Sequence, residues 1–204
     1  MWIDIDQNED DWLDLRAGKV TGSAISKVMA NYGKAFGEPA KKYAVDIAIE
    51  RITGNRIESG YTNEHMERGH EQEPIARQLY ESEYFCKVTK GGFFDNDDTG
   101  CSPDGLIGDD GIIEIKSVIP SVQYKTIKRG IPDPAYKWQL VWNLKESGRD
   151  WIEYVSYCQQ FPENKKLFVH RLHKNDLVEE FKQIKSRLSE FESLAFAITR
   201  DIMQ

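Results

Sequence analysis

Two carboxylates and one amine stand close together in the middle of the chain, at Asp104, Glu114 and Lys116. Nine residues separate Asp104 from Glu114, and one residue separates Glu114 from Lys116. Carboxylate oxygens are ligands that Mg²⁺ prefers, and an ammonium group stabilises the charge that a phosphate gains when water attacks it. The pattern is therefore typical of metal-dependent phosphodiester hydrolysis, provided that folding brings the three side chains to one face.

The surrounding segments predict a β-hairpin. Residues 100–107 and 112–118 have strand composition, and the Gly-Asp-Asp-Gly segment between them has turn composition. Side chains alternate along a strand, so an odd-numbered loop or a bulge is needed to bring Asp104 to the face of Glu114. We expect a three-residue loop at Asp109–Gly111, with the glycine left-handed. This register gives one face with Asp104, Leu106, Glu114 and Lys116, and an apolar face with Ile107, Ile113 and Ile115.

The alternative is a solvated acidic hairpin without a site, as most acidic hairpins are. The segment Ser102-Pro103-Asp104-Gly105 argues against this alternative. Proline interrupts the hydrogen bonds of a sheet unless it lies at an edge or at the first position of a strand. Pro103 therefore indicates a backbone that is bent for a purpose.

Composition predicts one domain over residues 1–204. The chain is 40% hydrophobic and has five Trp, nine Tyr and nine Phe, which is enough for a core. No apolar run approaches the roughly 18 residues that span a membrane, and the acidic start Met1–Asp6 is no signal peptide. Cys86, Cys101 and Cys158 form no C-x-x-C and indicate buried thiols in a reducing compartment. We expect a cytoplasmic protein with no membrane partner.

Taken alone, the formal net charge of −7 argues against a nucleic-acid partner, because phosphate contacts need Lys and Arg. Net charge says nothing about distribution, however, and a metal site itself requires acids. The charge is therefore compatible with a narrow basic groove on an acidic body. The chain has no P-loop and no G-x-G-x-x-G, so we expect no nucleotide cofactor.

The order of elements predicts an α/β or α+β domain around one mixed sheet. We expect strands at residues 84–88, 92–95, 101–107, 112–118, 151–158 and 166–173. Helices are expected at 21–29, 38–53, 62–80, 120–128, 134–146 and 176–202. Gly54 ends the second helix, and Pro74 predicts a kink or a new helix within the third. The last helix has an apolar stripe of Phe181, Ile184, Leu188, Phe191, Leu194 and Ala195.

Two helices carry polar residues at helical spacing. Glu73 lies four residues before Arg77, and this spacing favours an ion pair within the helix. Tyr136, Gln139 and Asn143 follow a 3, 4 spacing on the later helix and share one face. On spacing alone, the ion pair is the better interpretation of Glu73, whereas the second set is equally compatible with a site or with a polar helix face.

The motifs taken in order resemble the bacteriophage lambda exonuclease family, also called the YqaJ-like viral recombinases. The resemblance begins with Trp12-Leu13-Asp14-Leu15-Arg16 and Thr21-Gly22-Ser23, and continues with Arg68-Gly69-His70-Glu71-Gln72-Glu73. It ends with Cys101–Leu106, Glu114-Ile115-Lys116 and Ala135-Tyr136-x-x-Gln139. Each motif is weak alone, but their ordered occurrence over residues 10–172 is specific.

The resemblance implies a restriction-endonuclease-like core of the PD-(D/E)XK superfamily: a central mixed sheet flanked by helices, with helical elaborations at both ends. It implies an ATP-independent exonuclease that uses Mg²⁺, with Mn²⁺ as a possible substitute. Such an enzyme digests one strand of linear double-stranded DNA from its 5′ end and leaves 3′ overhangs for phage recombination by strand annealing. Implied partners are double-stranded DNA ends, a homotrimeric ring and a phage single-strand annealing protein, in the host bacterial cytoplasm if the gene belongs to a phage.

The resemblance also implies roles for individual residues. Asp104, Glu114 and the Ile115 carbonyl match metal ligands, and Glu73 matches an acid for a second metal ion. Lys116 matches the residue that positions or deprotonates the attacking water, and Gln139 matches a residue that orients it. The family binds the 5′-terminal phosphate at positions that match Arg16, Ser23 and Ser102.

Two positions depart from the family pattern. Val141 stands where the lambda enzyme has a second Gln, and Pro74 replaces a helix-compatible residue. The part after about residue 174 aligns poorly, which leaves subunit contacts open. The rival functions are a related endonuclease or single-strand nuclease of RecB type, and a catalytically inactive DNA-binding protein.

Overall fold

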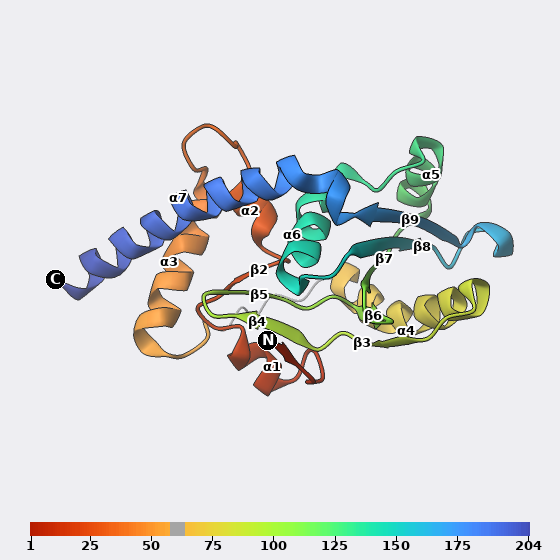
Figure 1. Cartoon of the computed structure of the whole chain (residues 1–204), viewed down its shortest axis with the longest axis horizontal. Coiled ribbons are helices and arrows are strands. Elements are labelled where there is room, and N and C mark those ends of the chain that lie inside the picture. Colours follow the sequence, from red (N-terminus) through yellow and green to blue (C-terminus); the bar gives the residue numbers. More distant parts are fainter. Residues whose placement is uncertain (58–63) are drawn as a thin grey trace.

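The computed structural model describes residues 1–57 and 64–204, which form two mixed β-sheets flanked by helices (Figure 1). The predicted mixed α/β class is confirmed. The prediction of one sheet is wrong, because the chain leaves the smaller sheet at Cys101 and enters the larger sheet at Gly105. Helices accompany both ends of the chain, as expected.

The smaller sheet contains four short strands in the order β1-β4-β5-β2. Their bounds are β1 Trp2–Ile3, β4 Phe93–Asn96, β5 Thr99–Cys101 and β2 Val20–Thr21. β4 is antiparallel to β1 and β5, whereas β2 runs parallel to β5. The pairing of β2 with β5 brings the segment after Arg16 beside the segment before Ser102.

The larger sheet has the order β3-β6-β7-β8-β9. Its strands are β3 Val88–Lys90, β6 Gly105–Ile107, β7 Gly111–Ser117, β8 Trp151–Tyr157 and β9 Leu167–His173. All neighbours are antiparallel except β7 and β8, which are parallel. Parallel strands need a crossover connection, which α5 (Pro120–Arg129) and α6 (Lys137–Ser147) provide. The strand that carries Glu114 is therefore the central one, held on both sides.

Helices cover the two faces of the larger sheet. On one face, Ile113 and Ile115 pack against Ala76 and Tyr80 of α4 (Glu64–Tyr84). On the other face, Ile112 packs in a core that includes α6, backed by α2 (Ile25–Met29), α3 (Glu38–Thr53) and α7 (Val178–Met203). The small helix α1 (Asp10–Leu15) precedes β2. These faces are the ones that the hairpin register predicted.

The long helix α7 lies along α3, and its C-terminal end extends beyond the rest of the fold (Figure 1). The predicted apolar stripe faces the core. Its buried members are Ile184, Phe191 and Ala195, and its partly buried members are Phe181, Leu188 and Leu194. Within the described residues, no helix is long and apolar enough to cross a membrane.

The hairpin that carries the acids differs from its prediction by one position. Ile107 pairs with Gly111, so the loop is Gly108-Asp109-Asp110, and the left-handed glycine is Gly108, with φ of 54°. The loop still has three residues, which preserves the alternation of side chains. The predicted placement of Asp104, Glu114 and Lys116 on one face is therefore confirmed.

Other boundaries show where the prediction was right and wrong. α3 and its stop at Gly54, with φ of 67°, are as expected. The expected strand at 101–107 is divided between β5 and β6, with Pro103 at the break. The expected strand at 84–88 is wrong, because α4 continues to Tyr84 and β3 begins only at Val88. α4 runs through Pro74 as one helix; its expected start at residue 62 lies outside the described residues.

Candidate active site

Asp104 occupies the point where the chain passes from one sheet to the other. Its backbone N–H donates to the Ile113 carbonyl at 3.0 Å, which holds it to β7 just before β6 begins. Its Oδ2 accepts a hydrogen bond of 2.6 Å from the Ile115 backbone N–H. Pro103, which precedes it, has no N–H to pair, and the chain bends at Asp104 so that its side chain lies against Ile115 of β7.

Glu114 is nearly fully buried, with a side-chain exposure of 1%. Lys116 Nζ lies 2.5 Å from its Oε1, and Gln139 Nε2 donates to the same oxygen at 2.6 Å. Asn143 Nδ2 donates to Oε2 at 2.7 Å. A buried carboxylate needs such partners, because an unpaired charge in the interior is costly. The polar face predicted on the later helix therefore binds Glu114 through Gln139 and Asn143.

The carboxylates also act on one another. Burial, and then repulsion by Glu114 and Glu73, raises the pKa of Asp104 well above its usual range, although Lys116 and the Ile115 N–H oppose this. Burial also raises the pKa of Glu73, with repulsion from Glu114 adding to it and Arg77 opposing it. A divalent cation between such groups would relieve their repulsion and desolvation.

Lys116 responds in the opposite sense. Burial alone would lower the pKa of its ammonium group, but the Glu114 and Asp104 carboxylates outweigh burial, and the pKa is raised. The ammonium group also lies 5.4 Å from the centre of the Tyr136 ring. Lys116 is therefore held as a cation between the acids and an aromatic face.

The donor set fits Mg²⁺ in chemistry. The Asp104 and Glu114 carboxylates and the adjacent Ile115 carbonyl are oxygen donors of the kind that hard cations take. In the described part of the chain, no three His, Cys, Asp or Glu side chains are grouped closely enough to hold a metal ion. The geometry brings the Asp104 and Glu114 carboxylates near one another, and Glu73 lies close to both while it pairs with Arg77.

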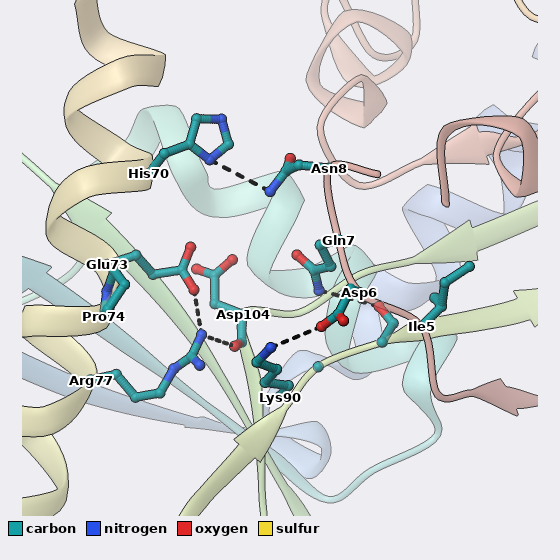
Figure 2. A pocket seen from close by; sticks show the side chains of 12 residues that line it. Ile5, Asp6, Gln7, Asn8, His70, Glu73, Pro74, Arg77, Lys90 and Asp104 are labelled. Carbon is teal, nitrogen blue, oxygen red and sulfur yellow. Dashed lines mark hydrogen bonds and ion pairs between the residues drawn. The ribbon is translucent and has the colours of Figure 1, made fainter. Parts of the chain in front are cut away.

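A polar cleft of about 210 Å³ opens beside Asp104. Figure 2 shows Glu73 and Asp104 pointing into it from α4 and from the start of β6, with the N-terminal segment as the opposite wall. Arg77 pairs with Glu73 and donates to the Asp104 carbonyl at 2.9 Å. The ion pair predicted within this helix therefore exists, and it forms part of the cleft wall.

A second constellation lies around Arg16. Its guanidinium donates to Ser23 Oγ at 3.1 Å and lies 3.9 Å from the centre of the Trp12 ring. Trp12 Nε1 donates to Ser102 Oγ at 2.8 Å. The structure therefore brings together Arg16, Ser23 and Ser102, although Ser102 is far from the other two in sequence.

Arg16 forms no ion pair with any carboxylate of residues 1–57 or 67–204, the side chains that the structure describes. Burial lowers the pKa of its guanidinium to about 10. Arg16 is half-buried and donates to the hydroxyl groups of Thr21 and Ser23. A guanidinium in such a place can bind an anion, because its N–H groups fit the oxygens of a phosphate.

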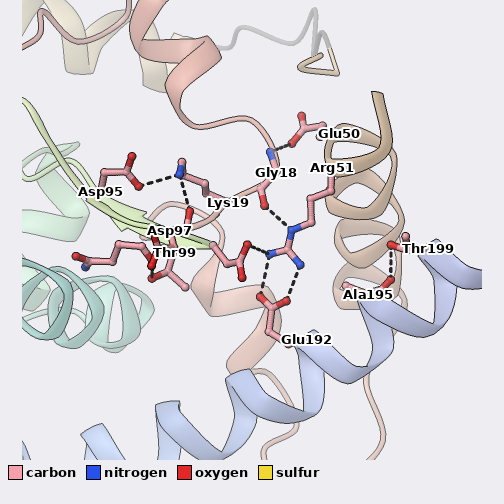
Figure 3. Close-up of polar contacts among 12 residues, drawn as sticks. Gly18, Lys19, Glu50, Arg51, Asp95, Asp97, Thr99, Glu192, Ala195 and Thr199 are labelled. Carbon is pink, nitrogen blue, oxygen red and sulfur yellow. Dashed lines mark hydrogen bonds and ion pairs between the residues drawn. The ribbon is translucent and has the colours of Figure 1, made fainter. Parts of the chain in front are cut away.

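The loop between α1 and β2, which follows Arg16, is held in place by polar contacts with α3, and α3 is in turn bound to α7. Arg51 donates from Nε to the Gly18 carbonyl at 2.8 Å and binds Glu192 of α7 at 2.6 Å (Figure 3). Glu50 accepts from the Gly18 N–H at 2.7 Å, and Lys19 pairs with Asp95 at 2.8 Å. The long C-terminal helix therefore helps to position the Arg16 pocket.

Comparison with known proteins places this arrangement in a family. Residues 11–150 match the family model of the YqaJ-like viral recombinase domain, which covers more than half of the chain. The chain belongs to the YqaJ-like viral recombinase family. The resemblance carried by the sequence motifs is thereby confirmed.

Solved structures support the same placement. The chain is similar to LHK-Exo, an alkaline exonuclease from Laribacter hongkongensis, with 32% identity and a TM-score of 0.78 over 96% of this chain and 98% of that one. A structure of LHK-Exo in complex with dAMP gives 32% identity and a TM-score of 0.79 over the same shares. A phage-related exonuclease from Haemophilus somnus 129PT shares the fold, with 16% identity and a TM-score of 0.67 over 90% and 96% of the two chains. No curated protein sequence matches.

Membership of the YqaJ-like family, together with this likeness to exonucleases, supports a nuclease that acts on DNA. The sequence motifs assigned no role to three residues that contact the acidic cleft or the Arg16 pocket. These residues are Trp12, Arg77 and Asn143. Each lies inside or beside a recognised motif. Spacing gave a signal for two of them: Arg77 lies four residues after Glu73, and Asn143 lies four residues after Gln139 on the same helical face.

Proposed function

We propose that this chain is a Mg²⁺-dependent, ATP-independent 5′-to-3′ exonuclease of linear double-stranded DNA. It would leave 3′ single-stranded overhangs for recombination by strand annealing and would need no nucleotide cofactor, with Mn²⁺ as a substitute metal. The observation that carries the proposal is the proximity in the chain of two sites, since Asp104 at the acidic cleft is two residues from Ser102 at the Arg16 pocket. One site suits hydrolysis and the other suits a terminal phosphate.

The residues of the cleft take separate roles in this proposal. Asp104, Glu114 and the Ile115 carbonyl would hold Mg²⁺, and Glu73 would serve a second ion. When bound, the metal supplies positive charge that activates water and stabilises the phosphate in the transition state. Lys116 adds a fixed cation beside the reacting phosphate, and Gln139 and Asn143 keep Glu114 in place.

The Arg16 pocket would determine where cutting begins. Arg16 would bind the 5′-terminal phosphate through its guanidinium, and Ser23 and Ser102 would donate from their hydroxyl groups. A terminal phosphate has one more ionisable oxygen than a phosphate within a strand, so the half-buried guanidinium of Arg16 would bind the end more strongly. LHK-Exo, a similar protein, has been solved in complex with dAMP, and this supports a site for a deoxynucleotide in that protein.

The family resemblance also suggests an oligomeric state and binding partners, which we put forward as proposals. We propose that residues 1–204 act as one exonuclease domain that assembles as a homotrimeric ring on double-stranded DNA ends. The end of α7 offers apolar surface for such contacts, because Phe196 is 71% exposed and Met203 is 67% exposed. A phage single-strand annealing protein would take up the product in the bacterial cytoplasm.

The proposal is tested by digestion of linear and circular duplex DNA with Mg²⁺ or EDTA. We expect the wild type to degrade only the linear DNA and only with Mg²⁺. D104A should lose more than the roughly 10–100-fold that the loss of an outer-shell partner costs. D109A is the matched control, because Asp109 is an exposed acid in the loop of the same hairpin. Cleavage of circles would favour the endonuclease alternative, and full activity of D104A would refute the site.

A further inference from the structure

One buried amide lies between the two sites. Asn143 is 1% exposed and donates from Nδ2 to Glu114 Oε2 at 2.7 Å. Because an ionised carboxylate only accepts hydrogen bonds, the NH₂ group must face Glu114. The Oδ1 atom then points the other way and has no hydrogen-bond partner among the described residues.

The Oδ1 atom rests against Gly22. A Cβ atom added to Gly22 would lie 2.3 Å from Asn143 Oδ1 and 3.3 Å from Trp142 Cδ1. The backbone of Gly22 lies outside the left-handed region, so conformation does not demand a glycine here. Space demands it, because any Cβ would displace the Asn143 amide from its place.

Gly22 belongs to the Arg16 pocket by position. It lies between Thr21 and Ser23, the two residues whose hydroxyl groups bind Arg16. The same stretch of α6 is also fixed to β5, since Trp142 Nε1 donates to the Gly100 carbonyl at 2.9 Å. One short segment of α6 therefore touches the phosphate pocket, the strand that leads to Ser102 and the buried acid.

We propose that Asn143 is a positioning residue for Glu114, and that its contact with Gly22 couples the end-binding pocket to the metal site. This inference rests on the proposed function and adds to it a mechanical link. A Cβ at position 22 pushes the amide, the amide releases Glu114 Oε2, and the carboxylate loses its alignment for the metal. A phosphate in the Arg16 pocket holds the same loop in place and supports the same alignment.

The test measures metal affinity without DNA. Mn²⁺ is titrated calorimetrically into the wild type, G22A, N143A and the double variant, and folding is followed by thermal melting in EDTA. We expect G22A and N143A each to weaken Mn²⁺ binding by about 10–100-fold, the usual effect of losing an outer-shell partner. The double variant should bind like N143A alone, because the clash needs the amide; independent sites would instead add their losses.

G37A is the matched control for G22A. Gly37 precedes α3 with ordinary dihedral angles, and an added Cβ would lie 3.5 Å from its nearest neighbour, Asn31. We expect its Mn²⁺ affinity to equal that of the wild type. If N143A fails to fold, N143S takes its place, because the shorter side chain also leaves room for a Cβ at position 22.

The outcomes separate this inference from the proposed function. Wild-type Mn²⁺ affinity in G22A, or additive losses in the double variant, would overturn the coupling even in an enzyme that digests DNA normally. A wild type that binds Mn²⁺ with the expected epistasis but leaves DNA intact would refute the function alone. A wild type that binds no Mn²⁺ would overturn both.

Discussion

Asp104 is a residue under electrostatic strain. It points into a cleft where burial, and then repulsion by Glu114 and Glu73, disfavours its negative charge, while Lys116 and the Ile115 backbone N–H oppose them. Clustered carboxylates lower the free energy of unfolding, and proteins retain them at sites where the charges bind a ligand. This trade-off has a measurable consequence in the metal-free protein.

We expect D104N to stabilise the metal-free chain at neutral pH. The raised pKa of Asp104 means that the folded chain keeps a proton that the unfolded chain loses, so the free energy of unfolding falls as pH rises above about 3.9. Asn has no charge to lose, so the melting temperature of D104N in EDTA should exceed that of the wild type at pH 8. Near pH 4 the difference should vanish. D109N is the exposed control, and a D104N that melts lower at pH 8 would contradict this reading.

Arg16 provides the second prediction at this scale. Because its guanidinium has no acidic partner among the described residues, a bound phosphate gains its full charge-assisted hydrogen bonds. We expect R16A to slow digestion of 5′-phosphorylated duplex by about 10–100-fold, the equivalent of about 1.5–3 kcal/mol. Digestion of 5′-hydroxyl duplex should change much less, as followed by initial rates on both ends. An equal loss on both substrates would refute the terminal-phosphate role.

At the scale of elements, the structure depends on a buried arginine in α7. Arg187 is 1% exposed and donates to the carbonyls of Val28, Ala30 and Lys34 at 3.0–3.2 Å. Its guanidinium also lies 3.7 Å from the centre of the Phe36 ring. One side chain therefore ties α7 to the connection between α2 and α3.

We expect R187A to lower the free energy of unfolding by on the order of 3 kcal/mol, because three carbonyl groups lose their donor in the interior. For a chain of this size that is a fall of roughly 6–12 °C in melting temperature, measured by calorimetry in EDTA. R200A is the control, since Arg200 is an exposed residue of the same helix and its loss should matter little. Equal melting temperatures for the two variants would show that the buried contacts contribute little.

Elements with strong local signals were predictable from sequence. α3 has Pro39 at its start and a left-handed Gly54 at its end, and both limits were predicted correctly. The division of residues 101–107 between two sheets was not predicted. Each part contains few paired residues, and the two adjacent hairpins, β4 with β5 and β6 with β7, belong to different sheets. Pro103 marked the bend, but local pattern does not show which sheet a strand joins.

The candidate site was predictable to a similar degree. Alternation along the hairpin placed Glu114 and Lys116 together, and helical spacing placed Gln139 and Asn143 on one face. Spacing alone does not show which carboxylate a helical face will meet. The hydrogen bond between Trp12 and Ser102 joins residues 90 positions apart in the sequence. The close approach of Asn143 to Gly22 likewise joins two separate motifs. Such pairs exist only once the sheets are assembled.

At the scale of the whole molecule, the chain is acidic, and most of the ion pairs of the described residues join a Lys or Arg to a neighbouring acid. The net charge of −7 weakens contact with duplex DNA in general, whereas the half-buried Arg16 has no carboxylate paired with it among the side chains that the structure describes. We infer that this distribution favours a strand end that can reach the pocket over the continuous duplex. The proposed function therefore fits the acidic composition, which at first argued against nucleic acid.

The measurement that tests the central claim most directly uses one linear duplex, phosphorylated at both 5′ ends and labelled on a single strand at either end. With Mg²⁺, we expect the 5′ label to be released at once as a mononucleotide, while the 3′ label stays on progressively shorter strands. D104A and EDTA should stop both changes. Early release of the 3′ label, or internal cuts that release long labelled fragments, would contradict a nuclease that digests from the 5′ end.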